Sequence, residues 1–258
     1  MSTLKKSEIS GYHAFAENSG WDGSYGSFLE KVKSGRESLY FRFLQETILV
    51  KSGKLLDFAA GTCWTSYIFA EKDYDVVALE MNQSELCGLG IFKKYRDDMP
   101  FTAVTGDCEN TPFKKGTFDV VFCHQALHHA GDLDRMVSEM AACARKDGFV
   151  IAGGEHIRPF FTSDEEFRKK HPAVEFGANE HAYPYYRYKD AFKRAGIREV
   201  KVLPRGFECD FDTISQKIIR NLIKSLAGIP LIGESIVSFI ILNFSGAGTE
   251  ITIYGIKS

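Results

Sequence analysis

The sequence lacks the features of a membrane-spanning or exported chain. Among its 258 residues, no uncharged apolar run approaches the ~20 residues that a spanning helix needs. The longest candidate is residues 236–244. No apolar segment of a secretory signal follows the charged start of the chain. We therefore expect a soluble protein, or at most one that is peripheral to a membrane.

The cysteines are few and lack a pairing pattern. Six are present and none lies in a Cys-x-x-Cys pair, which argues against a zinc ribbon, a thioredoxin-type site and a dense disulfide framework. We expect reduced thiols, and hence a cytoplasmic location.

The chain also lacks an excess of charge of either sign. Its 32 Lys and Arg residues nearly balance its 34 Asp and Glu residues, which leaves a net charge of −2. Such a chain has no long-range field with which to capture a polyphosphate backbone, so we expect no nucleic-acid partner.

What the sequence does have is a regular alternation of apolar runs and helix-patterned segments between residues 55 and 154. Runs that are apolar on both faces suit strands covered by helices on both sides. Strict alternation with crossover helices predicts a doubly wound, mainly parallel sheet of the Rossmann-like α/β class. The expected strands are residues 55–59, 75–80, 101–107, 118–123 and 148–154, and the expected helices are residues 63–72, 84–95 and 132–145.

The segments on either side of this core have different patterns. Residues 1–50 are predicted to form a helical cap, residues 51–155 the Rossmann-like core, and residues 156–258 substrate-binding helices and closing strands of the same domain. The alternating residues 248–258 predict an antiparallel edge strand at the C-terminus.

A tight turn of small residues follows the first predicted strand, with the sequence Asp57-Phe-Ala-Ala-Gly-Thr-Cys-Trp64. Such a turn between a strand and a helix lets the backbone approach a ligand. In a dinucleotide-binding fingerprint Trp64 would occupy the third glycine position, where an indole obstructs close packing of helix and strand. The alternative spacing, acid-x-small-x-Gly-x-small, places Asp57, Ala59, Gly61 and Cys63 in its four positions.

Through this spacing, residues 50–155 resemble the class I S-adenosylmethionine-dependent methyltransferases of the type 11 kind. Further matches are Glu80 at the end of the second strand, Gly106-Asp107 after the third, and the Phe118-Asp-Val-Val run of the fourth. The resemblance implies S-adenosylmethionine as cofactor and methyl transfer as activity. It also implies a cofactor site made by Asp57, Ala59, Gly61, Thr62, Glu80, Met81, Asp107, Cys108 and His124.

The resemblance assigns roles to some of these residues. Glu80 would accept both ribose hydroxyls, Met81 would pack on the adenine, and Asp107 would bind the adenine amino group. The methyl group of Ala59 fits the first glycine position if φ there stays negative, and Cys63 is small enough to pack under the loop.

Histidine is the natural proton acceptor when a hydroxyl attacks a methyl group, because its pKa lies near ~6.5. His128, His156 and His181 are the candidate catalytic bases, whereas His129 is expected to have a packing role. No His-Glu-x-x-His spacing is present, and no metal centre is expected.

The expected acceptor is a small or medium-sized molecule, such as a sugar or a lipid-linked compound. It is expected to be methylated at oxygen or nitrogen. Tyr12, Arg158 and Arg187 could meet an anionic acceptor group or lie on a solvated face. A helical stripe over residues 214–226 packs internally or, with residues up to 244, contacts a membrane surface.

Two other functions remain open. One is a methyltransferase-like binding or scaffold protein that has lost its activity, motivated by Ala59 and Cys63. The other is an NAD(P)-dependent oxidoreductase that uses Glu80 on the ribose, against which Trp64 counts.

Overall fold

A computed structural model of the chain describes residues 3–37, 41, 44, 52–159, 161–169, 171–204, 239, 242–243 and 249–258. The predicted amphipathic helical stripe, residues 214–226, lies outside these residues, as does most of residues 38–51. In the part of the chain that is described, no helix is both long and apolar enough to cross a bilayer.

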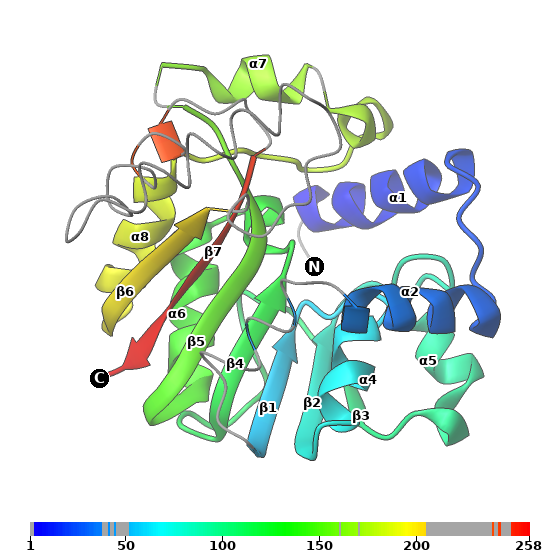
Figure 1. Ribbon diagram of the computed structural model, residues 1–258. Coiled ribbons are helices and arrows are strands. Elements are labelled where there is room, and N and C mark those ends of the chain that lie inside the picture. Colours follow the sequence, from blue (N-terminus) through cyan, green and yellow to red (C-terminus); the bar gives the residue numbers. More distant parts are fainter. Residues whose placement is uncertain are drawn as a thin grey trace.

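The fold is built on a seven-stranded sheet with the order β3-β2-β1-β4-β5-β7-β6 (Figure 1). The first five strands in this order are parallel. Strand β7 pairs antiparallel with β5, and β6 pairs antiparallel with β7. Their bounds are β1 Gly53–Phe58, β2 Tyr74–Glu80, β3 Thr102–Thr105, β4 Phe118–His124, β5 Ala144–Ile157, β6 Ile197–Pro204 and β7 Thr249–Lys257. The predicted Rossmann-like, mainly parallel sheet is confirmed.

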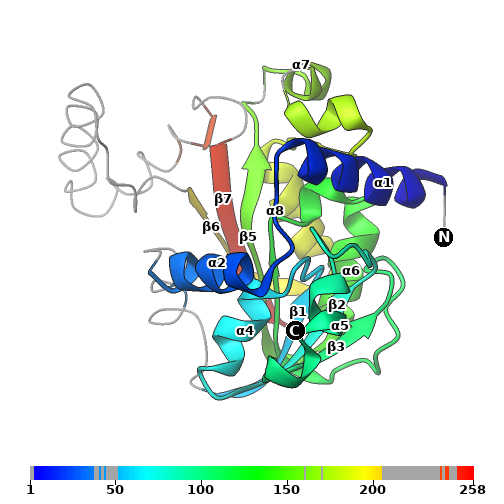
Figure 2. The same cartoon turned by 90° about the vertical axis from the view of Figure 1, so that its right-hand side faces the viewer.

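Helices cover both faces of the sheet, as the two-sided apolar strands require. One core packs α6 and α8 against the sheet, and the other packs α2 and α4 on the opposite face (Figure 2). The helices are α1 Thr3–Asn18, α2 Tyr25–Glu37, α4 Trp64–Ala70, α5 Gly90–Lys94, α6 Leu133–Cys143, α7 Asp164–Arg168 and α8 Tyr185–Arg194. Short 3-10 turns are η1 Arg96–Asp98, η2 Leu127–His129 and η3 Pro172–Phe176.

Two elements differ from the sequence expectation. The predicted helix over residues 84–95 is shortened to α5, because Asn82 and Ser84 side chains accept hydrogen bonds from backbone amides and hold residues 82–87 in turns. The C-terminal strand β7 is antiparallel as predicted, but it lies one strand in from the edge. The edge is β6, whose pairing with β7 was not expected from its sequence.

Candidate functional site

The carboxyl ends of the parallel strands open into a cavity of about 250 Å³. Ligands of open α/β sheets bind at this edge, where loops from neighbouring strands converge. Helix α1 lies across the same edge and forms the facing wall (Figure 1). All nine residues of the predicted cofactor set line the cavity: Asp57, Ala59, Gly61, Thr62, Glu80, Met81, Asp107, Cys108 and His124.

The loop between β1 and α4 alternates left-handed and ordinary backbone. Ala59, Gly61 and Cys63 have φ of 58°, 54° and 63°. The condition of a negative φ at Ala59 is therefore not met: its side chain is accommodated in the left-handed region, at a cost of roughly 1–2 kcal/mol. At Gly61, an added Cβ would find only the Cys87 carbonyl oxygen, at 3.9 Å, so the space beside this glycine is open.

The two large or reactive side chains of this loop do not fill the cavity. The Cys63 side chain is fully buried under the loop with Ala60, Ala78 and Leu89, as expected for a small residue there. Trp64 begins α4 and contributes to the cavity wall, with its ring 5.3 Å from that of His124 in an edge contact.

Glu80 ends β2 and ties this loop to the neighbouring strand. Its Oε2 accepts a hydrogen bond from the Gly61 amide at 2.9 Å. Its Oε1 accepts from the amides of Met81 and Asn82, both at 2.8 Å. Burial raises the pKa of Glu80 above 4.5, although the three amides oppose this shift. The carboxylate thus faces the cavity from a fixed position.

Asp57 is fully buried one strand away. Its Oδ2 accepts hydrogen bonds from the hydroxyls of Thr65 at 2.6 Å and Ser66 at 2.5 Å. Its Oδ1 has no hydrogen-bond partner among the described residues. Burial raises the pKa of Asp57 to about 6, against the two hydroxyls. A buried acceptor without a donor is costly, so this side chain is suited to a donor supplied by a ligand.

Asp107, after β3, contacts helix α1. Lys5 donates to its Oδ1 at 2.6 Å and to its Oδ2 at 2.7 Å, and also pairs with Glu109 at 3.2 Å. Burial acts to raise the pKa of Asp107, but the hydrogen bond from Lys5 holds it below 3.8. The ion pair fixes the first turns of α1 against the loop that the resemblance assigns to adenine.

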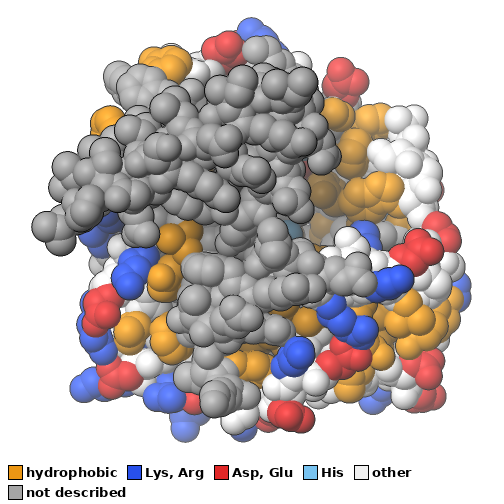
Figure 3. Space-filling model, in the orientation of Figure 1, with side chains coloured by type: hydrophobic (Ala, Val, Ile, Leu, Met, Phe, Trp, Pro, Cys, Tyr) orange, Lys and Arg blue, Asp and Glu red, His pale blue; other side chains and the backbone are white. Residues whose placement is uncertain are grey.

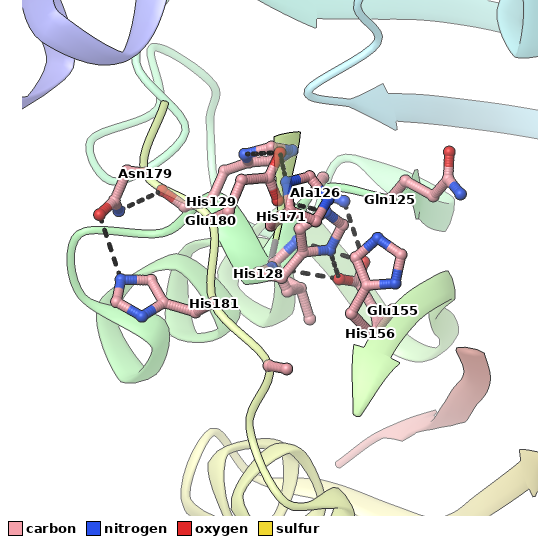
Figure 4. A network of polar contacts seen from close by, with 12 residues as sticks. Gln125, Ala126, His128, His129, Glu155, His156, His171, Asn179, Glu180 and His181 are labelled. Atoms are coloured by element: carbon pink, nitrogen blue, oxygen red, sulfur yellow. Dashed lines mark hydrogen bonds and ion pairs between the residues drawn. The ribbon is translucent and has the colours of Figure 1, made fainter. Parts of the chain in front are cut away.

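The three predicted catalytic histidines do not line the cavity. His128 is 2% exposed, with its Nδ1 2.8 Å from Glu155 Oε2. His156 packs with its ring 4.5 Å from that of His128. His181 is held between Asp164, at 2.7 Å, and Asn179, at 3.1 Å. The geometry does not support these residues as bases, because their rings are engaged behind the wall (Figure 4).

The histidines that do reach the cavity are His124 and His129. His129, which was expected only to pack, lies 3.0 Å from Glu8 and 3.9 Å from Glu180. Burial opposes protonation of this ring, but the contact with Glu8 and the charge of Glu180 raise the pKa of His129 to about 9. It is therefore an imidazolium at neutral pH and not a free base.

Sequence reasoning missed Lys5 and Glu8 of α1, which face the strand edge from this helix. Tyr12, which the sequence offered as a contact for an acceptor, also lines the cavity and packs edge-on to His129 with ring centroids 5.5 Å apart. Charged and aromatic residues recur along α1 at helical spacing. The alternation that predicted the strands does not show that this helix lies against the carboxyl ends of the sheet. In space-filling view, hydrophobic side chains gather on the α1 side of this face (Figure 3).

The charges around the cavity are mainly negative. The cavity is lined by two lysines, Lys5 and Lys31, and by five carboxylates, namely those of Glu8, Asp57, Glu80, Asp107 and Glu109. This balance favours a ligand with cationic groups. It disfavours the pyrophosphate of a dinucleotide, for which the Gly61 amide is also unavailable because it donates to Glu80.

Comparison with known proteins agrees with this geometry. Residues 56–152 match the family described as "Methyltransferase domain". A demethylmenaquinone methyltransferase of Renibacterium salmoninarum is 32% identical over 142 residues, which are 53% of this chain and 58% of that protein. The chain thus spans a little under two thirds of the length of the first curated relatives that it matches.

Solved structures share the fold. A geranyl diphosphate methyltransferase in complex with S-adenosylmethionine superposes with a TM-score of 0.60 at 17% identity, over 92% of each chain. The Haemonchus contortus phosphoethanolamine N-methyltransferase 2 with S-adenosyl-L-methionine gives a TM-score of 0.59 at 15% identity, over 84% of this chain and 51% of that one.

Proposed function

We propose that this chain, whose residues 56–152 match the methyltransferase domain family, transfers a methyl group from S-adenosylmethionine to a small organic acceptor. The observation that carries the proposal is the convergence of Asp57, Glu80 and Asp107, from three neighbouring strand ends, on one cavity rich in carboxylates. A sulfonium and an α-ammonium are cationic groups of the kind that such a cavity favours.

The residues present fit this cofactor on three counts. The unpartnered Asp57 Oδ1 offers an acceptor to an ammonium or to a water bound to it. Glu80 is held in place by three amides, and its Oε2, which accepts from one amide only, retains capacity to accept a hydrogen bond from a hydroxyl group. The open space beside Gly61 leaves room for a ligand to approach the backbone.

When bound, the cofactor supplies an activated methyl group on a sulfonium, which is a strong leaving group. The chain must then align the acceptor atom with the methyl carbon and exclude water. Helix α1 performs the exclusion, since its residues close the cavity opposite the strand ends. The carboxylates of Asp57 and Glu80 orient the cofactor, and the wall formed by Tyr12, His124 and His129 faces the acceptor.

We propose a small acceptor with an apolar body, methylated at an oxygen, nitrogen or carbon atom that requires little basic assistance. Apolar side chains line the α1 side of the cavity, namely Leu4, Ile9, Tyr12, Trp21 and Met136. The names of the relatives specify demethylmenaquinone and geranyl diphosphate, both organic small molecules. The division of the chain into a cap of residues 1–50, a cofactor-binding core of residues 51–155 and a closing segment of residues 156–258 is part of the same proposal.

The test is calorimetric titration of the purified chain with S-adenosylhomocysteine and, separately, with NADH. We expect heat from the first and none from the second. Glu80→Ala should weaken binding about 100-fold, whereas Asp75→Ala, which removes an exposed acid at the other end of the same strand, should leave it unchanged. Binding of NADH alone would instead establish the dinucleotide alternative.

A second measurement addresses activity. Isotopically labelled S-adenosylmethionine is incubated with the chain and small-molecule extracts, including quinone precursors and prenyl diphosphates, and methylated products are sought by mass spectrometry. Cofactor binding without transfer to any extract would favour the binding-protein alternative.

A further inference from the structure

Behind the cavity wall, four of the seven histidines of the chain gather around buried carboxylates (Figure 4). His128 and His129 lie on η2, and His156 ends β5 close to them. Glu180 comes from the segment after η3 and lies 3% exposed among the rings. Its carboxylate is 3.6 Å from His128 Nε2, 3.9 Å from His129 Nδ1 and 3.8 Å from His171 Nδ1.

We propose that His128, His129 and Glu180 form a zinc site. One nitrogen from each histidine and one oxygen of Glu180 lie within 4.8 Å of one another. Tetrahedral zinc with nitrogen and oxygen bonds of ~2.0–2.2 Å holds its ligand atoms roughly 3.4 Å apart, so small side-chain adjustments bring these atoms to bonding distance. Two neutral imidazoles and a carboxylate are a ligand set that zinc accepts, and its binding releases the proton that His129 carries in the metal-free chain.

The hydrogen bonding of His128 supports this assignment. Glu155 Oε2, 2.8 Å from Nδ1, directs that nitrogen to carry the proton, and Glu155 is itself held by the amides of Ala126, Leu127 and His128. The unprotonated Nε2 then faces Glu180 Oε2, so that two lone pairs oppose each other in a buried place. A carboxylate on the outer nitrogen and a metal on the inner one is the usual arrangement of a metal-bound histidine.

Glu180 gives an independent sign of a missing partner. Its Oε2 is buried and has no hydrogen-bond partner among the described residues. The ring nitrogen His171 Nδ1 shares this condition, whereas His129 Nδ1 faces Glu8 at 3.0 Å. Buried polar atoms are rarely left in this way, and a cation placed among these atoms would satisfy them together.

The charges of the cluster point to a divalent ion. Glu8, Glu155 and Glu180 are 15%, 0% and 3% exposed, and in the ion pairs of the described residues they meet histidines and no lysine or arginine. Three carboxylates gathered in a mostly buried place are costly, even though backbone amides hold Glu155 and the His129 imidazolium faces Glu8. A divalent cation in place of the His129 proton offsets two of these three negative charges, where the proton offsets one.

The protein holds the ligands in place without the ion. The His181 amide donates to the His128 carbonyl at 3.1 Å, and Asn179 Nδ2 donates to the His129 carbonyl at 3.1 Å. These two bonds flank Glu180 and fix it opposite η2. Because His129 and Glu8 also line the cavity, the zinc would lie at the wall of the proposed acceptor site.

The experiment loads tag-free protein with Zn²⁺, removes loosely held metal by dialysis against a weak chelator, and measures zinc by mass spectrometry. We expect one equivalent per chain. Glu180→Gln and His129→Gln should retain at least tenfold less, whereas His13→Gln, which removes a partly exposed histidine from α1, should retain the full equivalent. Loss of zinc in His13→Gln would overturn the assignment.

Co²⁺ gives a measurement on the unaltered chain, so that the proposal stays testable if a variant does not fold. Tetrahedral d–d absorption without a thiolate charge-transfer band supports nitrogen and oxygen ligands. A thiolate band would place the ion on cysteines and overturn the proposal, as would less than a tenth of an equivalent of zinc in the wild-type chain. Neither result depends on cofactor binding, which the titration with S-adenosylhomocysteine measures separately.

Discussion

Two regions of this molecule bury carboxylates, and they satisfy them in different ways. At the strand ends, Glu80 and Asp57 accept hydrogen bonds from backbone amides and hydroxyls of the adjoining loop and helix. Behind the wall, Glu155 and Glu180 lie against histidine rings, and only Glu155 also has backbone donors. The first region is built by local chain geometry, whereas the second depends on segments that meet only in the folded protein.

The largest effect should come from removing the best-satisfied of these carboxylates. Glu155→Ala leaves three buried amides and a histidine without their acceptor, so the free energy of unfolding should fall by about 3–5 kcal/mol. Denaturant titration measures it. The control Glu165→Ala, at an exposed position on α7, should change it by less than about 0.5 kcal/mol. Equal effects would remove the distinction between the buried and surface acids.

Removing Glu80 sharpens the comparison from the other side. In Glu80→Ala the Gly61 amide and its neighbours lose their acceptor and the loop loses its tie to β2. Affinity for S-adenosylhomocysteine should fall about 100-fold, which corresponds to roughly 2.7 kcal/mol. Calorimetry reports it, with Asp75→Ala as the variant expected to bind normally. Unchanged affinity in Glu80→Ala would contradict the proposed role.

Asp57 links pH to stability. Its pKa is about 6 in the folded chain, above the ordinary value of 3.8 for an aspartate, so the native state binds the proton more tightly. The contribution of Asp57 to the free energy of unfolding is then greatest below about pH 4, and it is lost as the pH rises through about 6. Asp57→Asn should remove this dependence and raise the free energy of unfolding at pH 7 by about 1–3 kcal/mol. Thermal unfolding between pH 4 and 8 measures both effects, and a variant less stable at pH 7 would contradict them.

The smallest effect concerns the backbone of the loop. Ala59 has a φ of 58°, so Ala59→Gly should relieve strain and stabilise the protein by about 1 kcal/mol. The neighbour Ala60 is absent from the residues with positive φ, and Ala60→Gly should destabilise by about 0.5–1 kcal/mol. The two adjacent changes thus have opposite signs in the same unfolding experiment.

The parts that sequence predicted well are those that strand periodicity fixes. Apolar runs located β1, β2, β4 and β5, and the carboxyl ends of parallel strands share one edge, so Asp57, Glu80 and Asp107 could be placed around one cavity. The edge strand β6 was not predicted, because the alternation of apolar and polar residues in its sequence is weak and its burial depends on pairing with β7.

The histidines could not be sorted in the same way. Adjacent residues on a single turn point in different directions, so His128 is buried behind the wall while His129 reaches the cavity. Neither the backbone bend at η2 nor the approach of Glu180 from about fifty positions along the chain leaves a local signal. Local spacing rules do not cover the proposed zinc ligands, since the two histidines and Glu180 come from separate elements.

The attachment of α1 has a consequence for turnover. The helix is joined to the strand edge by Lys5 with Asp107 and Glu109, and by Glu8 with His129. Its Gly11 approaches η3 so closely that an added Cβ would lie 2.6 Å from the Gly177 carbonyl carbon. Departure of the spent cofactor therefore requires charged contacts to separate, and the release rate should increase with ionic strength, because dissolved salt weakens those attractions.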